Sequence, residues 1–252
     1  MLGLGLIGGS VLRALAAAGH RVTGYDVDPA TRAAAAEAGE AARWWIADTI
    51  RDAVATAAVV VVAVPLPAVA EVLDELVDAG YTGLVTDVTS VKLPVRDLVD
   101  QRRRPDGPLA AFVGGHPMAG REVSGFAAAD PALFHGCAWV LCLEPEHTDL
   151  SSWLELAALV TGLGARVVPA TAAEHDRAVA SVSHVPHLLA VALAATVATD
   201  PLAATLAAGS FRDGTRVAAS PPSLIAAMCG GNARAVGPAL DAVLGTLRQA
   251  RE

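Results

Sequence analysis

The sequence predicts a doubly wound, mostly parallel α/β sheet followed by a smaller domain made only of helices. Short β-branched runs alternate with alanine-rich helical stretches up to about residue 170, the pattern of a parallel sheet covered by helices. A glycine-rich turn stands at the start of this part, and no strand-like run follows Thr171. We therefore predict an α/β domain at residues 1–170 and a helical domain at residues 171–252.

The first domain is expected to alternate strands and helices along the chain. The predicted strands are short runs rich in branched residues, at 21–25, 58–64, 83–87, 111–113, 138–143 and 166–169. The predicted helices lie at 10–18, 29–38, 50–55, 68–79, 92–102 and 150–163. In the second domain, proline and glycine predict helix breaks at Pro186, Pro201, 209–214, 221–222 and 230–231.

Composition excludes several classes of protein. A chain of 252 residues that is 54% hydrophobic can bury a core without disulfides or a structural metal. The formal net charge of −8 argues against nucleic acid as the main partner. Three cysteines form no CxxC pair and no secretory leader is recognisable, so we expect a cytoplasmic protein without a metal site.

Two uncharged runs raise the question of a membrane span. The run at 53–70 contains two prolines behind a β-branched block, which predicts a buried strand followed by a turn. The run at 178–199 carries polar residues and a proline in its first half, leaving only 188–199 as a plain apolar helix. That length suits a buried helix better than a bilayer, so we predict no membrane partner.

The glycine-rich turn has the form of a dinucleotide fingerprint, Gly3-Leu4-Gly5-Leu6-Ile7-Gly8, and is expected to open a helix near Ser10. Its glycines allow a tight turn, close approach of a pyrophosphate and close packing of the helix. The helix N-terminus adds N–H groups and a positive dipole for the phosphates. Gly3, Gly5, Leu6, Ile7 and Gly8 are therefore predicted to bind a dinucleotide in a Rossmann-type domain.

Asp26 indicates which dinucleotide is preferred. It ends the second predicted strand, 18 residues beyond Gly8, near the separation typical of the acid that binds the adenosine ribose. A carboxylate there repels a 2′-phosphate, so NAD is expected over NADP; the alternative is that Asp26 only caps a turn. Pro65, directly behind the strand at 58–64, is assigned to the same cofactor site.

The first strand is short in the sequence. Only Met1 and Leu2 precede Gly3, although this strand is central in a doubly wound sheet. Losing about five residues of it would leave buried N–H and C=O groups unpaired, at a cost of roughly 1–3 kcal/mol each. The expectation is that the natural start lies upstream of Met1.

Four further segments carry polar residues in apolar or glycine-rich surroundings. They are residues 87–92 (DVTSVK), 114–122 (GGHPMAGRE), 183–187 (SHVPH) and 211–216 (FRDGTR). Together with GLGLIGGS, the motifs SVK, GGHPMAG, SHxPH and FRDxTR occur in the order and at the separations of one known family, and they extend over nearly the whole chain. On these motifs the chain resembles the prephenate/arogenate dehydrogenase family of tyrosine biosynthesis.

The resemblance implies an NAD-dependent oxidative decarboxylation, in which a hydride leaves the carbinol carbon of a cyclohexadienol acid and the ring carboxylate departs as CO₂. His116 is then the base that takes the 4-hydroxyl proton, a task suited to an imidazole near neutral pH. Ser90 would align His116 with the substrate. Arg216 would hold a substrate carboxylate through its planar fork, and His187 and Glu122 would be further substrate contacts.

Structural alternatives stay open for two of these residues. Ser90 can simply cap the helix expected near Lys92. His184 and His187 share one face if their segment is helical. One is then expected to bond backbone around Pro186 and the other to meet ligand, and we favour His187 as the ligand contact.

The chain departs from the family at Ile225, where an aromatic residue that reaches the other subunit is common. A cross-subunit role at this position is therefore not expected. The alanine-rich stretches at 188–199 and 202–208 suit the homodimer that the family forms. Other two-domain NAD-dependent dehydrogenases or imine reductases, and a non-catalytic nucleotide-binding relative, are the competing hypotheses. Prephenate and arogenate differ only in a keto or amino group, to which no residue is assigned.

Overall fold

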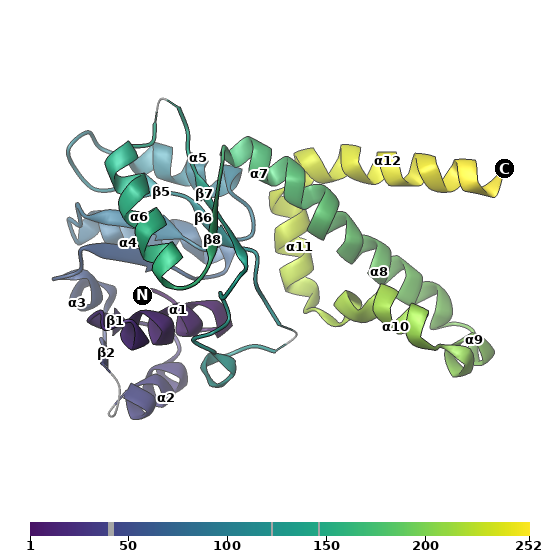
Figure 1. Ribbon diagram of the computed structural model, residues 1–252, viewed down its shortest axis with the longest axis horizontal. Coiled ribbons are helices and arrows are strands. Elements are labelled where there is room, and N and C mark those ends of the chain that lie inside the picture. The colour runs from purple at the N-terminus through teal and green to yellow at the C-terminus, as the bar shows by residue number, and fades with distance from the viewer. Residues whose placement is uncertain (40–42, 122, 146) are drawn as a thin grey trace. The chain divides into compact units, whose positions relative to one another are not determined.

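The computed structural model describes residues 1–39, 43–121, 123–145 and 147–252 (Figure 1). Two compact units divide the chain, Met1–Ala172 and Ala173–Glu252. The first unit contains strands and helices, and the described elements of the second are all helical. This arrangement confirms the predicted fold class.

A parallel sheet forms the centre of the first unit. Its strands are β1 (Val22–Gly24), β2 (Trp44–Ile46), β3 (Val59–Val62), β4 (Leu84–Asp87) and β5 (Phe112–Val113). β1 pairs with β2, and β3, β4 and β5 pair in that order, all in parallel. Leu2 bridges Tyr25 on one side and Val62 on the other. The resulting order β2-β1-Leu2-β3-β4-β5 is that of a Rossmann sheet with Leu2 at its centre.

The chain then leaves the parallel sheet and enters a second one. β6 (Gly115–Pro117) runs antiparallel to β7 (Ala138–Cys142), which pairs in parallel with β8 (Arg166–Ala170). The sequence interpretation missed β2 and β6. Each has three residues, and β6 consists of glycine, histidine and proline, so that neither period nor propensity marks it as a strand.

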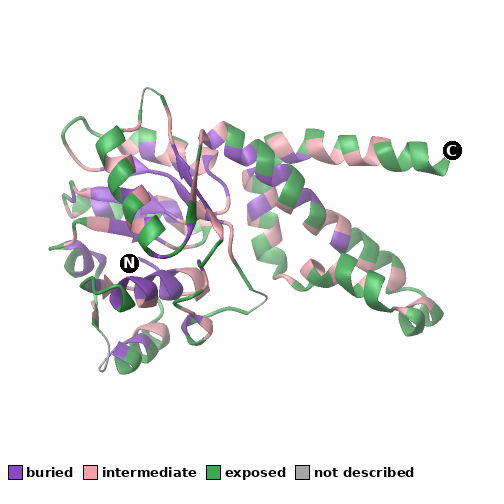
Figure 2. Cartoon of the chain, viewed as in Figure 1, coloured by how far each residue is buried: buried purple, intermediate pink, exposed green. Residues whose placement is uncertain are grey.

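Helices cover both faces of the parallel sheet, and each face forms its own core (Figures 1 and 2). One core joins Val61, Leu84 and Val113 to helices α1 (Leu6–Ala17) and α6 (Leu150–Gly162). The other core joins Leu2, Val60 and Val85 to three further helices. These are α3 (Ile50–Val54), α4 (Val69–Asp78) and α5 (Leu93–Arg102). Alternate strand residues point to opposite faces, so both faces are apolar, as a buried parallel sheet requires.

Three further elements complete the first unit. Helix α2 (Pro29–Gly39) follows β1, and 3-10 turns occupy η1 (Leu66–Ala68) and η2 (Phe126–Ala128). The predicted start of the first helix near Ser10 is wrong, because α1 begins at Leu6 with Gly5 as its N-cap. The fingerprint itself therefore supplies the first helical turn.

Helices of both ordinary and unusual geometry build the second unit. In chain order they are α7 (Ala172–Val179), the π-helical η3 (Ala180–His184), α8 (Val185–Val197), α9 (Pro201–Leu206), α10 (Gly209–Thr215), the 3-10 turn η4 (Arg216–Ala219), α11 (Pro222–Gly231) and α12 (Ala233–Arg251). The helical path from Ala172 to Val197 is long and apolar enough to cross a membrane by length and composition alone.

Two predicted helix breaks are wrong. Pro186 stands in the first turn of α8, where proline needs no N–H partner, and the π-helical segment before it continues the helical path. Residues 209–214 lie in α10 rather than in a break. A Cβ at Gly214 would stand 3.6 Å from the Leu193 side chain, so packing against α8 accounts for a helix that the glycines alone disfavour.

Candidate functional site

The glycine loop has room for a ligand at one position and none at two others. Gly3 has a φ of +91°, and a Cβ there would lie 2.4 Å from the carbonyl oxygen of Ala63. A Cβ on Gly8 would lie 2.0 Å from the Gly3 carbonyl oxygen. Around Gly5, by contrast, no atom of the described residues lies within 4 Å of such a Cβ. The first N–H groups of α1 therefore face an open space suited to an anion.

Asp26 is tied to the same loop. Its Oδ2 accepts a hydrogen bond of 2.7 Å from Leu4 N, and its Oδ1 accepts one of 2.9 Å from Asp28 N. The carboxylate thus closes the turn behind β1 and at the same time braces the fingerprint. Pro65 is exposed directly behind β3. The residues predicted to bind the cofactor therefore gather at the carboxyl ends of neighbouring parallel strands, where such folds bind ligands.

A buried ion pair follows β4. Asp87 and Lys92 are each 1% exposed, and the lysine Nζ donates to Asp87 Oδ2. Thr89 supports the carboxylate through its backbone N–H at 3.0 Å and its hydroxyl at 2.5 Å. Both side chains also form hydrogen bonds with the backbone of Gly115. The Gly115 N–H donates to Asp87 Oδ1 at 3.1 Å, and Lys92 Nζ donates to the Gly115 carbonyl oxygen at 2.5 Å.

His116 lies on strand β6, next to this ion pair, and is half-buried. The sequence interpretation placed it in a segment without strand character, which is wrong: His116 pairs with Val140 of β7. Ser90 is half-buried in the loop between β4 and α5. Lys92 occupies the N-cap position of α5.

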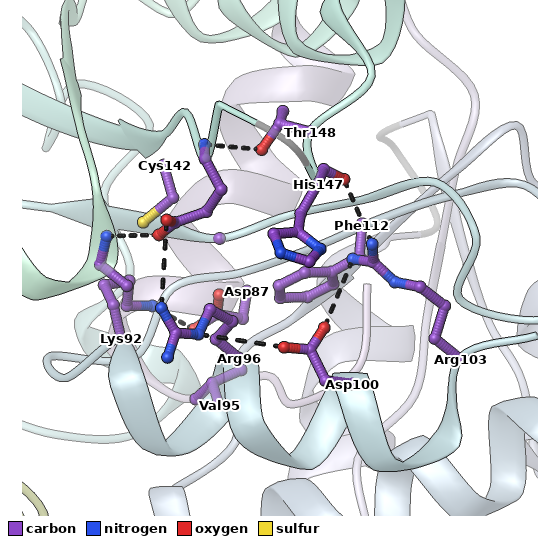
Figure 3. A pocket seen from close by; sticks show the side chains of 13 residues that line it. Asp87, Lys92, Val95, Arg96, Asp100, Arg103, Phe112, Cys142, His147 and Thr148 are labelled. Atoms are coloured by element: carbon purple, nitrogen blue, oxygen red, sulfur yellow. Dashed lines mark hydrogen bonds and ion pairs between the residues drawn. The ribbon is translucent and has the colours of Figure 1, made fainter.

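A small cavity adjoins the ion pair (Figure 3). It measures about 20 Å³ and is lined by charged side chains that include Asp87, Lys92, Arg96 and Glu144. Arg96 stands 4.0 Å from Glu144, whose Oε1 accepts a 2.6 Å hydrogen bond from Ala172 N. A space of this size holds about one water molecule. The cavity is thus too small for an organic acid.

The other predicted substrate residues belong to the helical unit, apart from Glu122, which lies outside the described residues. Arg216 begins η4 and is exposed. His187 is half-buried on α8, with its Nδ1 2.8 Å from the Ser183 carbonyl oxygen. Because a carbonyl only accepts, Nδ1 carries a proton, and in the neutral imidazole the lone pair is then on Nε2. The histidine that bonds backbone near Pro186 is therefore His187, the one we favour as the ligand contact.

His184 instead belongs to a buried polar cluster. It is fully buried, and its Nδ1 lies 3.1 Å from Asn232 Nδ2, which also donates to the Asp176 carbonyl oxygen at 2.7 Å. Its Nε2 has no hydrogen-bond partner among the described residues. Asp176 in turn pairs with His175 at 2.7 Å. This cluster joins α7, η3 and the start of α12, and it indicates a structural role for His184.

Acidification is expected to destabilise the helical unit through His184. Burial, opposed by the Asp176 carboxylate, lowers the pKa of His184 to about 4 from an ordinary 6.5. Between those values the unfolded chain binds more protons than the folded one, so the free energy of unfolding falls as pH falls. The loss attributable to His184 is about 3 kcal/mol between pH 7 and pH 4.

Urea unfolding of the wild type and of His184→Gln at several pH values measures this effect. The pH dependence should be shallower in His184→Gln, whereas the exposed-site variant His20→Gln should retain the wild-type dependence. Equal slopes for the wild type and His184→Gln would remove His184 as the cause.

Asp87 and Lys92 are the residues that sequence reasoning missed. Both stand in the quoted segment DVTSVK, but neither received a role. The sequence contained a signal for the role of Lys92: it is the single lysine beside 17 arginines, and it closely follows the predicted strand at 83–87. A buried lysine requires a partner, and the two nearest acids in the sequence are Asp87 and Asp97, each five residues away.

Comparisons with known proteins match both units. The family model "Prephenate dehydrogenase, nucleotide-binding domain" matches residues 11–169, and "Prephenate dehydrogenase, dimerization domain" matches residues 171–252. A prephenate dehydrogenase of Bacillus subtilis is 36% identical over 89% of this chain. The chain spans 61% of the length of that relative.

Two solved structures are similar over nearly the whole chain. Arogenate dehydrogenase of Synechocystis has a TM-score of 0.83 at 30% identity, covering 98% of this chain and 88% of its own. Prephenate dehydrogenase of A. aeolicus, in complex with hydroxyphenyl propionate and NAD⁺, has a TM-score of 0.87 at 26% identity, with coverages of 98% and 87%.

Proposed function

The chain belongs to the prephenate dehydrogenase family, and from that premise we propose that it catalyses the NAD-dependent oxidative decarboxylation of prephenate or arogenate. One observation carries the proposal. The fingerprint packs on Ala63 and Val64 behind β3, and the segment that bears His116 is bonded to Asp87 at the end of the neighbouring strand β4. A nucleotide loop and the strand that bears a half-buried imidazole are therefore both attached to the carboxyl ends of neighbouring strands of the parallel sheet.

The residues of the loop fit NAD. The open space at Gly5 admits a pyrophosphate, which the N–H groups of Leu6 and Ile7 at the start of α1 would bind. Asp26 would bind the adenosine ribose and disfavour a 2′-phosphate. Pro65 would line the nicotinamide side of the same edge. When bound, NAD⁺ supplies the hydride acceptor.

The chemistry left to the side chains is proton transfer and orientation. The neutral imidazole of His116 takes the proton of the 4-hydroxyl as the C–H bond at that carbon gives up a hydride. The bond between the ring and its carboxylate then breaks, its electron pair enters the ring, and CO₂ leaves. Ser90 would hold the hydroxyl in line with His116. The products are an aromatic phenol, NADH and CO₂, with the proton on His116.

Substrate recognition is assigned to three residues. Arg216 would bind a substrate carboxylate by two parallel hydrogen bonds. His187, with its lone pair on Nε2, would accept a hydrogen bond from a hydroxyl or ammonium group of the substrate. Glu122 would be a further substrate contact.

The same proposal covers assembly and location. Leu193, Leu202, Leu206 and Leu224 are exposed on the helical unit, together with Val182 and Val191. A second copy of this chain would cover them, since a monomer rarely exposes so much apolar surface. Such a homodimer would also keep the apolar path Ala172–Val197 out of a membrane. We infer a cytoplasmic enzyme that acts on small molecules and has no nucleic-acid partner.

Formation of NADH by the purified protein tests the proposed reaction. The assay supplies NAD with prephenate, then NAD with arogenate, and repeats both with NADP. Turnover with either acid and NAD supports the proposal and identifies the side-chain group that is accepted. NAD binding without turnover of either acid would contradict it and favour a nucleotide-binding relative without catalysis.

Substitution of Arg216 tests the carboxylate contact. Arg216→Lys should raise the substrate KM about tenfold with little change in kcat, because a point charge replaces a bidentate fork in both ground and transition states. Arg212→Lys, an exposed neighbour on α10, is the matched control and should leave KM unchanged. An unchanged KM for Arg216→Lys would mean that the carboxylate is bound elsewhere.

A further inference from the structure

Strand β6 has an unusual hydrogen-bonding requirement on the side that faces away from β7. Gly114 O accepts from Cys142 N at 2.7 Å, and Met118 N donates to Ala138 O at 2.8 Å. Since backbone groups alternate in direction along an antiparallel strand, Gly114, His116 and Met118 face β7. Gly115 and Pro117 therefore turn their backbone groups to the opposite side.

Among the described residues, no further strand pairs with β6 on that opposite side to satisfy these groups. Proline has no N–H to satisfy, so Pro117 removes one of the donors. Gly115 retains both an N–H and a carbonyl, and it is buried. Its N–H donates to Asp87 Oδ1 and its carbonyl accepts from Lys92 Nζ. At Gly115, the ion pair thus makes the two hydrogen bonds that a neighbouring strand would otherwise make.

The fit around Gly115 is too tight for any other residue. A Cβ there would lie 2.6 Å from the Asp87 carbonyl oxygen and 3.1 Å from Thr86 Oγ1. Asp87 lies at the end of β4 and Lys92 at the N-cap of α5, so their contact with Gly115 joins the parallel sheet to the sheet of β6, β7 and β8. The residue attached to this junction is His116.

We propose that Asp87 and Lys92 form a positioning clamp: by holding both backbone polar groups of Gly115, they fix the imidazole of His116 for proton transfer. The inference rests on the proposed function, which makes His116 the base. Neither clamp residue touches the reacting atoms in this scheme. A displacement of about 1 Å in a positioned base can cost a factor of about 100 in rate, which sets the scale of the expected effect.

The variants must separate positioning from folding. Lys92→Met alone leaves Asp87 as a buried carboxylate without a cation, which strongly destabilises a fold. The double variant Asp87→Asn/Lys92→Met removes both charges, keeps the side-chain volumes similar and retains an acceptor for Gly115 N–H. Asp74→Asn/Arg102→Met is the matched control, because it removes an ion pair of 2.6 Å between α4 and α5 that does not contact Gly115.

Steady-state kinetics and a histidine spectrum provide the two readouts. The clamp variant should lower kcat about 10-fold to 100-fold with the KM for NAD unchanged, because the fingerprint lies on another strand. In the ligand-free protein, the ring C–H resonances of His116, assigned by their loss in His116→Asn, should shift or broaden. The control variant should change neither quantity.

The outcomes distinguish the clamp from the reaction. A folded clamp variant with wild-type kcat and an unchanged His116 spectrum overturns the clamp while the reaction stands. A wild type that turns over neither acid overturns the reaction, and the His116 spectrum of the clamp variant then decides whether the ion pair positions that ring.

Discussion

Replacing His116 with asparagine should lower kcat by about 10²–10⁴-fold, the usual contribution of a positioned general base. Asparagine keeps a polar side chain of similar reach but cannot accept a proton near neutral pH. His116 is half-buried on β6, and its strand pairing uses backbone alone, so the fold should survive the change. The affinity for NAD should also stay the same, because the fingerprint is separate from β6.

The measurement is the initial rate of NADH formation under saturating NAD and substrate, with the Kd for NAD determined separately. His135→Asn, an exposed histidine of the same unit, serves as the control and should retain full activity. Near-normal kcat in His116→Asn would remove His116 from the mechanism and transfer the role of base to another group.

Local signals in the sequence predicted most of the elements that build this sheet. Runs such as Val59–Val62 are β-branched and are followed by prolines, here Pro65 and Pro67, so their strand character is local. The central position of Leu2 also follows from the fingerprint, because the strand before it is central in every doubly wound sheet.

The missed elements depend on contacts that are distant in sequence. β2 contains two tryptophans and pairs only with β1. β6 pairs with β7, and Asp87 and Lys92, more than 20 residues earlier in the sequence, satisfy Gly115 on the other side. Propensity at residues 115–117 carries no record of that contact. The nearest sequence signal was the single lysine, whose burial becomes evident only once the sheet is assembled.

The residues of the candidate site likewise fall into those that local sequence predicted and those that only the fold distinguishes. The fingerprint and Asp26 were predictable because a dinucleotide fixes the spacing of the residues that bind it. The histidines of SHVPH were harder to separate, because both lie within one turn. Only the three-dimensional fold shows that His184 is enclosed with Asn232 and Asp176, whereas His187 keeps an available Nε2.

Two glycine substitutions in the fingerprint should fail in different ways. Gly8→Ala places a methyl group 2.0 Å from the Gly3 carbonyl oxygen, and because the clash is with backbone, α1 must move. We expect a loss of roughly 3 kcal/mol or more in the free energy of unfolding, at the upper end of overpacking effects. Thermal or urea unfolding measures this loss directly.

Gly5→Ala should lower the free energy of unfolding by no more than about 1 kcal/mol: alanine is a poorer N-cap than glycine, but Gly5 has a φ of −66° that alanine adopts freely. Its methyl group would instead occupy the space reserved for the pyrophosphate, and the Kd for NAD should rise on the order of 100-fold, or about 2.7 kcal/mol. Titration of NAD against the two folded proteins checks this. The added methyl group would contact no other described protein atom, so it can weaken binding only by meeting the ligand. Wild-type affinity for NAD in Gly5→Ala would therefore mean that the phosphates do not approach the N-terminus of α1.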